Sequence, residues 1–203
     1  MFDLGGVVID LDRDRCVEQY KKLGFADISS DLDQYVQSGI FYELETGKIT
    51  TAGFYDFCLR QCAPGTSTVQ IQDAFNAFLV ELPVERLRKI REIRNRFQTF
   101  ALSNTNPVMY DSWIAQKFRQ EGLTINDYFD GIVTSFQEGT CKPDTTIFQR
   151  LLERNSLNPA RTLFLDDSEA NCQAARECGI MAERITSDNN MISVISRLTD
   201  DRQ

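Results

Sequence analysis

The second half of the chain alternates short apolar runs with longer segments of helical periodicity. The apolar runs predict strands at 99–104, 131–135, 162–168 and, more weakly, 181–185. The segments between and around them predict helices at 84–96, 107–122, 144–155, 169–178 and 190–198. Strands that alternate with helices of this length imply right-handed crossovers and a mostly parallel sheet. We therefore expect an α/β fold.

Residues 14–82 interrupt this alternation. Four segments of this stretch have helical patterns: CVEQYKKLG, DQYVQSGIFYELETG, TTAGFYDFCLRQC and TVQIQDAFNAFLVEL. The stretch is also rich in aromatic residues, most of which we expect to pack in the core of a helical bundle. The pattern predicts a Rossmann-like core formed by residues 1–13 and 83–203. An all-helical cap, residues 14–82, is inserted after the first strand.

The first strand of that core is short in the sequence. Only Met1 and Phe2 precede Asp3, whereas a strand typically has about 5–6 residues. We expect either an unusually short first strand or a chain that lacks a few native residues. The second case would leave Asp3 poorly anchored.

Composition narrows the classes of function. The formal net charge of -8 and the pI near 4.7 argue against a broad nucleic-acid surface, which needs a basic face. No apolar run approaches the roughly 20 residues that span a bilayer, and the N-terminus does not have the pattern of a signal peptide. We therefore predict a cytoplasmic protein without a membrane segment, with its six cysteines as reduced thiols.

The sequence contains no histidine. Phosphohistidine enzymes, Ser-His-Asp and Cys-His hydrolases, and zinc sites built on imidazole are therefore excluded. Any acid, base or nucleophile must be supplied by Asp, Glu, Lys, Tyr, Cys, Ser or Thr.

Several polar residues follow directly on predicted strands, where sites on parallel sheets gather. Asp3 precedes a pair of glycines, and a carboxylate in such a place can attack phosphorus. Ser103-Asn104 ends the run 99–104 and offers a hydroxyl and backbone N–H groups to a phosphoryl oxygen. Each feature alone also fits an ordinary turn.

Two further features complete the set. Lys142 lies in a loop before a helix, where its ammonium could offset the charges of a nucleophile and a phosphate. Asp166-Asp167 ends the most apolar strand and supplies hard oxygen ligands that suit Mg²⁺. An acidic pair can also simply cap a helix. The case for one reaction therefore depends on the order of all these features along successive strands.

Four segments of the sequence resemble, in order, the four motifs of the haloacid dehalogenase superfamily: FDLGGVVID, FALSNTN, GTCKPDTTIF and LFLDDSEANCQAARECGI. The resemblance spans the whole chain, because the inserted helical stretch is similar to the cap that follows the first motif in one large branch. It implies an Mg²⁺-dependent phosphatase that hydrolyses a small phosphorylated metabolite, such as a sugar phosphate, through an aspartyl phosphate. It also implies the roles of the individual residues: Asp3 as nucleophile, Ser103, Asn104 and Lys142 as phosphate ligands, Lys142 also as the charge-neutralising group, and Asp3, Asp167, Asp166 and the backbone carbonyl of Gly5 at the metal.

The sequence departs from the family at one position. Phosphatases of this superfamily usually carry a second aspartate two residues after the nucleophile, as general acid and base, and here that position is Gly5. General acid–base catalysis contributes about 10²–10⁴-fold. Either the substrate has a good leaving group, or another acid serves, or the chain binds phosphate without turnover as a regulatory protein. The candidates for another acid are Asp10, Asp12, Glu43 and Glu45.

A similar DLG motif occurs in a branch that resembles sugar-1-phosphate phosphatases, which favours activity. If the leaving group compensates for Gly5, activity on glucose 1-phosphate should exceed that on glucose 6-phosphate. The metal-independent 2-haloacid dehalogenases also lack the second aspartate. They have an aromatic residue in its place, so the Gly5-Gly6 pair and the acidic pair fit a phosphatase better.

Overall fold

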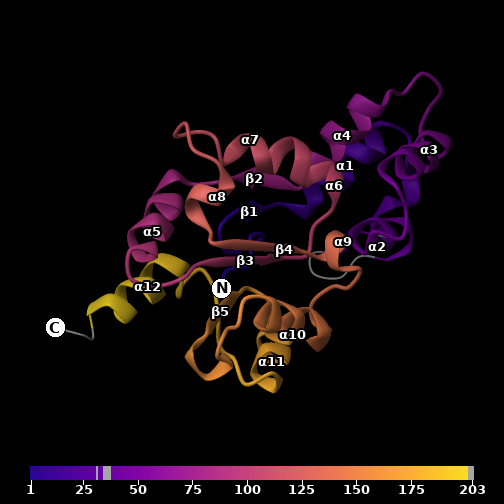
Figure 1. Cartoon of the computed structure of the whole chain (residues 1–203). Helices are drawn as coiled ribbons and strands as arrows, with labels where there is room; N and C mark the ends of the chain where they lie inside the picture. The colour runs from indigo at the N-terminus through magenta and orange to yellow at the C-terminus, as the bar shows by residue number, and fades with distance from the viewer. Residues whose placement is uncertain (31, 34–37, 201–203) are drawn as a thin grey trace.

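The computed structural model describes residues 1–30, 32–33 and 38–200. Its centre is a parallel sheet (Figure 1). The strands β3 (Phe100–Ser103) and β4 (Gly131–Thr134) pair in parallel, and so do β5 (Leu163–Asp166) and β6 (Met181–Arg184). Each lies within the run that the sequence predicts, so the predicted α/β fold with a mostly parallel sheet is confirmed.

Phe2 joins the two halves of the sheet. It forms parallel bridges with Ala101 on one side and Leu165 on the other. The Phe2 N–H donates to the Phe100 carbonyl at 2.8 Å, and the Asp3 N–H donates to the Leu165 carbonyl at 2.9 Å. Phe2 forms these bridges without a longer strand around it, and its backbone is bonded to both neighbouring strands. Asp3 follows Phe2 at the centre of the sheet and is firmly anchored.

Helices cover both faces of the sheet, because successive strand side chains point to opposite faces. On one face, Phe100 and Leu102 of β3 and Phe164 of β5 pack in a cluster with α10 (Thr145–Arg154) and α11 (Glu169–Glu177). On the other face, α5 (Val84–Arg94), α8 (Ile125–Tyr128) and α12 (Met191–Asp200) pack on a larger apolar cluster. Figure 1 shows the two layers above and below the strands.

The helix predicted at 107–122 is shorter and irregular. It begins as α6 (Pro107–Met109), continues as a π-helical turn at Tyr110–Ile114, and ends as α7 (Ala115–Lys117). A π-turn accommodates one extra residue per turn and is frequent at functional sites. Here it places Ser112 against the inserted helices, where its hydroxyl and the Asn76 side chain exchange hydrogen bonds.

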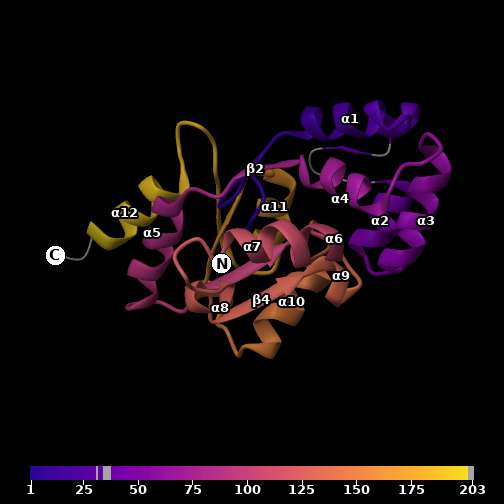
Figure 2. The ribbon, with the colours of Figure 1, turned by 90° about the horizontal axis from the view of Figure 1, so that it is seen from above.

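The helical insertion, residues 13–76, lies at one end of the molecule (Figure 2). It comprises α1 (Arg13–Lys22), a 3₁₀ turn at Ala26–Ser30, α2 (Gly39–Glu45), α3 (Thr51–Gln61) and α4 (Thr68–Asn76). The rings of Tyr20, Phe41, Phe54 and Phe75 pack together at its centre. The helix predicted at 33–47 falls partly on residues 34–37, outside the described residues. No helix in the described part of the chain is long and apolar enough to cross a membrane.

The predicted all-helical character of residues 14–82 is wrong at the C-terminal end of this range. The helix ends at Asn76, and Leu79–Glu81 forms the strand β2. It pairs antiparallel with β1 (Asp10–Leu11). The chain thus enters and leaves the insertion through a two-stranded ribbon. The backbone pairing of the two connecting segments outweighs the helical spacing of the apolar residues in FLVEL.

Candidate active site

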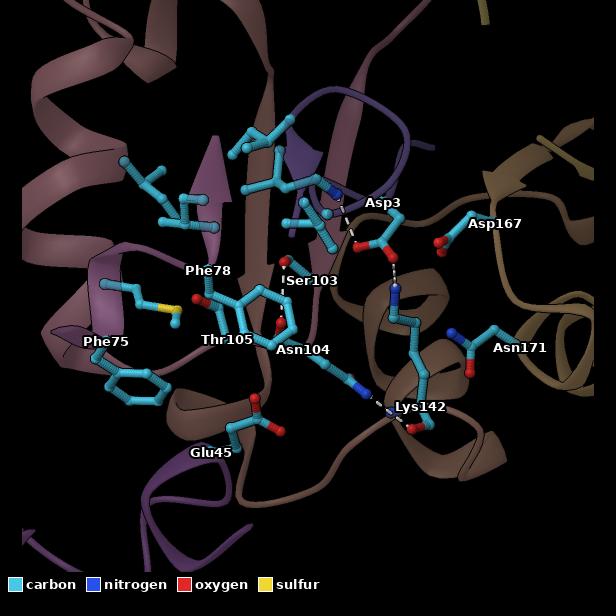
Figure 3. Close-up of a pocket in the computed structure, with 17 residues that line it drawn as sticks. Asp3, Glu45, Phe75, Phe78, Ser103, Asn104, Thr105, Lys142, Asp167 and Asn171 are labelled. Atoms are coloured by element: carbon cyan, nitrogen blue, oxygen red, sulfur yellow. Dashed lines mark hydrogen bonds and ion pairs between the residues drawn. The ribbon is translucent and has the colours of Figure 1, made fainter. Parts of the chain in front are cut away.

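One cavity at the carboxyl edge of the sheet brings together the residues predicted from separate motifs (Figure 3). The strands and their following loops contribute Asp3, Gly5, Ser103, Asn104, Lys142 and Asp167 to its lining. The helical insertion, its connection to β2 and the first residue of β2 contribute Glu45, Phe75, Phe78 and Leu79. Asp166 lies fully buried beside the cavity.

Lys142 stands between two buried carboxylates. Its Nζ is 2.8 Å from Asp3 Oδ2 and 2.7 Å from Asp166 Oδ2. Burial opposes the charge on Lys142, but the attraction of Asp166 and Asp3 is stronger and raises the pKa of Lys142 above its usual value. Lys142 therefore stays an ammonium and can neutralise charge at the carboxyl edge of the sheet.

The Asn104 side chain holds the Lys142 backbone. Its Nδ2 donates to the Lys142 carbonyl at 2.9 Å, and its Oδ1 accepts from the Lys142 N–H at 2.8 Å. The Asn104 amide is thus occupied in placing Lys142, and this leaves the Asn104 backbone N–H as the group that can meet a phosphoryl oxygen. Ser103 is buried at the end of β3, beside Asn104 in the same cavity.

Asp3 is buried, and its environment disfavours charge. The pKa of Asp3 lies well above its usual value because burial removes water from the carboxylate; Lys142 opposes this rise, while Asp166 and Asp167 add to it. Burial and then the charge of Asp166 raise the pKa of Asp167 to about 6. The three carboxylates therefore repel one another, and this repulsion is offset in part by Lys142 and, at Asp167, by Arg184.

This carboxylate group fits a divalent cation. Oxygen atoms of Asp3, Asp166 and Asp167 all lie within 4.8 Å of one another. Hard oxygen ligands of this kind suit Mg²⁺. Both oxygens of Asp166 are also engaged by protein donors, Lys142 at 2.7 Å and Asn171 at 3.0 and 3.2 Å. Asp3 has fewer such contacts, because each of its oxygens meets one donor, the Leu4 N–H at 2.7 Å or Lys142 at 2.8 Å.

We expect added magnesium to reverse the order of thermal stability of wild type and the Asp167→Asn variant. With EDTA at pH 7 the variant should melt at the higher temperature, because it lacks a carboxylate that folding must bury against Asp166. With Mg²⁺ at roughly 100 times its Kd, wild type should gain about 5–10 °C and overtake the variant. Differential scanning calorimetry measures both orders.

The pH dependence of this difference has a defined sign. The pKa of Asp167 is raised from 3.8 to about 6 on folding, so the metal-free wild type loses stability as the pH rises from about 4 to above 6. The advantage of Asp167→Asn in EDTA should therefore disappear near pH 4. An advantage that is equal at pH 4 and pH 7 would contradict this explanation.

Gly6 is required beside the carboxylates for two reasons. Its φ of +72° lies in the left-handed region, and a Cβ on it would come within 2.2 Å of Asp167 Oδ2. Any side chain at this position would displace Asp167. The second glycine of the first motif therefore makes room for a carboxylate that comes from the fourth motif.

Gly6→Ala should weaken magnesium binding, and Gly122→Ala should not. Gly122 has the same φ of +72° but nothing within 4 Å of its Cβ position. It therefore isolates the backbone strain, about 1–2 kcal/mol. Gly6→Ala should destabilise the fold by more and also raise the Kd of Mg²⁺ measured by calorimetry. Equal magnesium affinity in the two variants would show that Asp167 is not displaced.

Asn171 and Glu45 are functional candidates in the cavity that the set of predicted site residues does not include. The Asn171 side chain, in the first turn of α11, donates to both oxygens of Asp166. The sequence signal for this residue is an amide about one helical turn after the acidic pair. Glu45 lies at the end of α2, and the sequence offered it only as one of four replacement acids. The structure brings Glu45 alone of these four into the cavity lining.

The fold and this site define a hydrolase core with a buried carboxylate–lysine centre under a helical insertion. A family model described as haloacid dehalogenase-like hydrolase matches residues 1–179. A D-ribitol-5-phosphate phosphatase of Bacteroides thetaiotaomicron is 36% identical over 179 residues, which cover 88% of this chain and 87% of that protein. The chain belongs to the haloacid dehalogenase-like hydrolase family.

Solved structures agree with this assignment. An enzyme of the same family from Bacteroides thetaiotaomicron, in complex with magnesium and inorganic phosphate, is 35% identical and superposes with a TM-score of 0.87 over 94% of each chain. A predicted hydrolase of this family from Porphyromonas gingivalis is 34% identical, with a TM-score of 0.89 over 98% of this chain and 96% of that one. The family and fold predicted from the sequence are confirmed, and the predicted enzyme class and magnesium cofactor agree with these relatives.

Proposed function

We propose that this protein is an Mg²⁺-dependent phosphatase that hydrolyses the phosphomonoester of a small polyol or sugar. The observation that carries the proposal is the Lys142 ammonium between Asp3 and Asp166, with Asp167 beside them in one cavity. Support for the substrate class comes from the phosphatase relative, which acts on D-ribitol 5-phosphate. A small phosphorylated metabolite is also compatible with a net charge of -8, because one cation such as Lys142 and a few backbone N–H groups can hold a single phosphate.

Asp3 is the proposed nucleophile. Its Oδ1 accepts from the Leu4 N–H at 2.7 Å and its Oδ2 meets Lys142, so the carboxylate is fixed directly after Phe2 at the centre of the sheet. Attack on phosphorus forms an aspartyl phosphate and releases the alcohol, and water then hydrolyses the intermediate. Lys142 stays between Asp3 and the phosphate and offsets their repulsion.

The phosphoryl oxygens and the metal have separate proposed ligands. Ser103 through its hydroxyl, Asn104 through its backbone N–H and Lys142 hold the phosphate. Asp3, Asp167 and the Gly5 carbonyl hold Mg²⁺, with Asp166 beside them. Bound Mg²⁺ supplies positive charge that lets an anionic carboxylate approach an anionic phosphate. The helical insertion acts as the cap that closes this cavity, and a cytoplasmic location stays a prediction.

A substrate panel tests the proposal. Purified protein with Mg²⁺ should release phosphate from D-ribitol 5-phosphate, from other alditol and sugar phosphates, and from p-nitrophenyl phosphate. EDTA should abolish the release. Glucose 1-phosphate and glucose 6-phosphate belong in the panel, because their order separates leaving-group compensation from a replacement acid. Phosphate binding without turnover would favour a regulatory protein, and halide release from a 2-haloacid in EDTA would favour a dehalogenase.

A further inference from the structure

Position 5 leaves the reaction without a proton donor next to Asp3. A Cβ built on Gly5 would come 3.0 Å from Leu11 Cδ1. Leu11 therefore fills the space that an acidic side chain at this position would enter. An alkyl phosphate needs a proton on its leaving oxygen, because an alkoxide is a poor leaving group. The proton must come from another element of the structure.

The other three candidate acids lie outside the cavity. Asp10 forms an ion pair with Arg86 at 2.7 Å, and Asp12 accepts from the Arg15 N–H at 3.0 Å as the N-cap of α1. Glu43 is exposed to solvent on α2. None of the three carboxylates is among the residues that line the cavity.

Glu45 enters the cavity from the insertion, on the side across from Asp3 (Figure 3). It is the only acidic residue of the described part of the insertion in the cavity lining; its neighbours Phe75 and Phe78 are apolar. Glu45 is partly buried. Its carboxyl group makes no hydrogen bond or ion pair with the described residues, so it is available to a ligand.

Packing fixes this end of α2 on the core. The Cys141 thiol donates to the Glu45 carbonyl at 3.8 Å. Two residues further on, Gly47 turns with a φ of +65° directly against the core, where a Cβ would meet the Phe136 carbonyl oxygen at 2.4 Å. Phe136 belongs to α9 (Ser135–Glu138), which follows β4. Glu45 is therefore held over the site by contacts next to Lys142.

We infer that Glu45 is the general acid of this phosphatase, an inference that rests on the proposed function. As an Asp3 oxygen bonds to phosphorus, the bond between phosphorus and the alcohol oxygen breaks, and its electron pair stays on that oxygen. The Glu45 carboxyl proton moves to the same oxygen, so a neutral alcohol leaves and Glu45 becomes a carboxylate. When water attacks the aspartyl phosphate, its proton returns to Glu45, and phosphate and Asp3 are released.

The surroundings of Glu45 favour its protonated form at neutral pH. Burial raises the pKa of Glu45 to about 8, although the positive charge of Lys142 works against the rise. The nearby Cys141 thiol is neutral, because burial and then Glu45 raise its pKa to about 12. Lys48, the other cation near Cys141, lies over the Tyr42 ring at 5.0 Å.

The test compares Glu45→Gln with wild type on two substrates that differ in their leaving groups. The ratio kcat/KM reports the steps up to release of the alcohol. For D-ribitol 5-phosphate it should fall about 10²-fold or more, and for p-nitrophenyl phosphate, whose phenolate leaves without a proton, by less than about 3-fold. For the alkyl phosphate, wild-type kcat/KM should also decline above about pH 8, and this decline should be absent in the variant.

Matched variants separate catalysis from structure. Glu43→Gln, on the same helix but exposed, should leave both substrates unaffected, and Glu45→Asp should restore part of the alkyl phosphatase activity. An equal loss of activity on both substrates would overturn the inference, and so would no loss on either substrate. A wild-type protein that hydrolyses p-nitrophenyl phosphate alone would overturn it as well. A wild type without Mg²⁺-dependent activity on either substrate refutes the proposed function itself.

Discussion

Asp3→Asn is expected to lower kcat/KM for phosphate release by at least about 10⁴-fold, which corresponds to about 5 kcal/mol of transition-state stabilisation. The amide keeps the shape of the side chain and can still accept from the Leu4 N–H, whose bond to Asp3 is 2.7 Å. It cannot attack phosphorus as a carboxylate does, so the covalent route is lost. A coupled phosphate assay over a wide range of enzyme concentrations measures the loss.

Two controls make this result specific. Asp10→Asn removes a nearby carboxylate that is 44% exposed and paired with Arg86 outside the cavity, and it should retain wild-type activity. Asp3→Asn should also melt no lower than wild type in EDTA, because burial raises the pKa of Asp3 and its charge therefore opposes folding. A folded Asp3→Asn protein with activity close to that of wild type would remove Asp3 from the mechanism.

Lys142→Met should cost both activity and stability. The variant leaves Asp3 and Asp166 buried without their shared cation, and breaking a buried pair in this way costs about 3–5 kcal/mol. It also removes a fixed positive charge from the phosphate, which lowers kcat by roughly 10²–10³-fold. Urea denaturation in EDTA and steady-state kinetics with Mg²⁺ measure the two losses.

The loss of stability should depend on pH with a known sign. Lys142 opposes the rise that burial causes in the pKa of Asp3, so without Lys142 this pKa is still higher and Asp3 takes up a proton on folding. The difference between Lys142→Met and wild type should therefore shrink as the pH falls toward 4. Lys89→Met, which breaks a surface pair of 2.9 Å with Glu92, should cost less than about 1 kcal/mol at any pH. Equal costs for the two variants would show that the buried pair contributes no more than a surface one.

The strands of the core could be predicted because buried parallel strands appear in the sequence as short apolar runs. The strands β3, β4, β5 and β6 all fall within such runs, and each is followed by a turn or helix signal. The ribbon of β1 and β2 was missed because strands of two and three residues have no periodicity to detect. The residues of FLVEL continue the helical spacing set by Phe75, and only a long-range partner distinguishes the strand.

The candidate site was predicted as a set of residues but not as a set of contacts. Ordered motifs put Asp3, Ser103 and Asp167 at the ends of strands, and parallel topology brings such ends together. Pattern alone could not show that the Asn104 amide holds the Lys142 backbone, because that contact joins two loops 38 residues apart. Nor could it distinguish Glu45 from Glu43. Both lie on α2, and only the packing of this helix on the core decides which of them lines the cavity.

The most direct test of the central claim is to look for phosphate on Asp3. Wild-type protein is mixed with a ³²P-labelled phosphomonoester and Mg²⁺, quenched in acid at successive times, digested and mapped. The account predicts label on the peptide that contains Asp3, released by hydroxylamine as expected for an acyl phosphate, and absent from Asp3→Asn. Product formation over the whole time course with no label on that peptide, or with label on another residue, would contradict it.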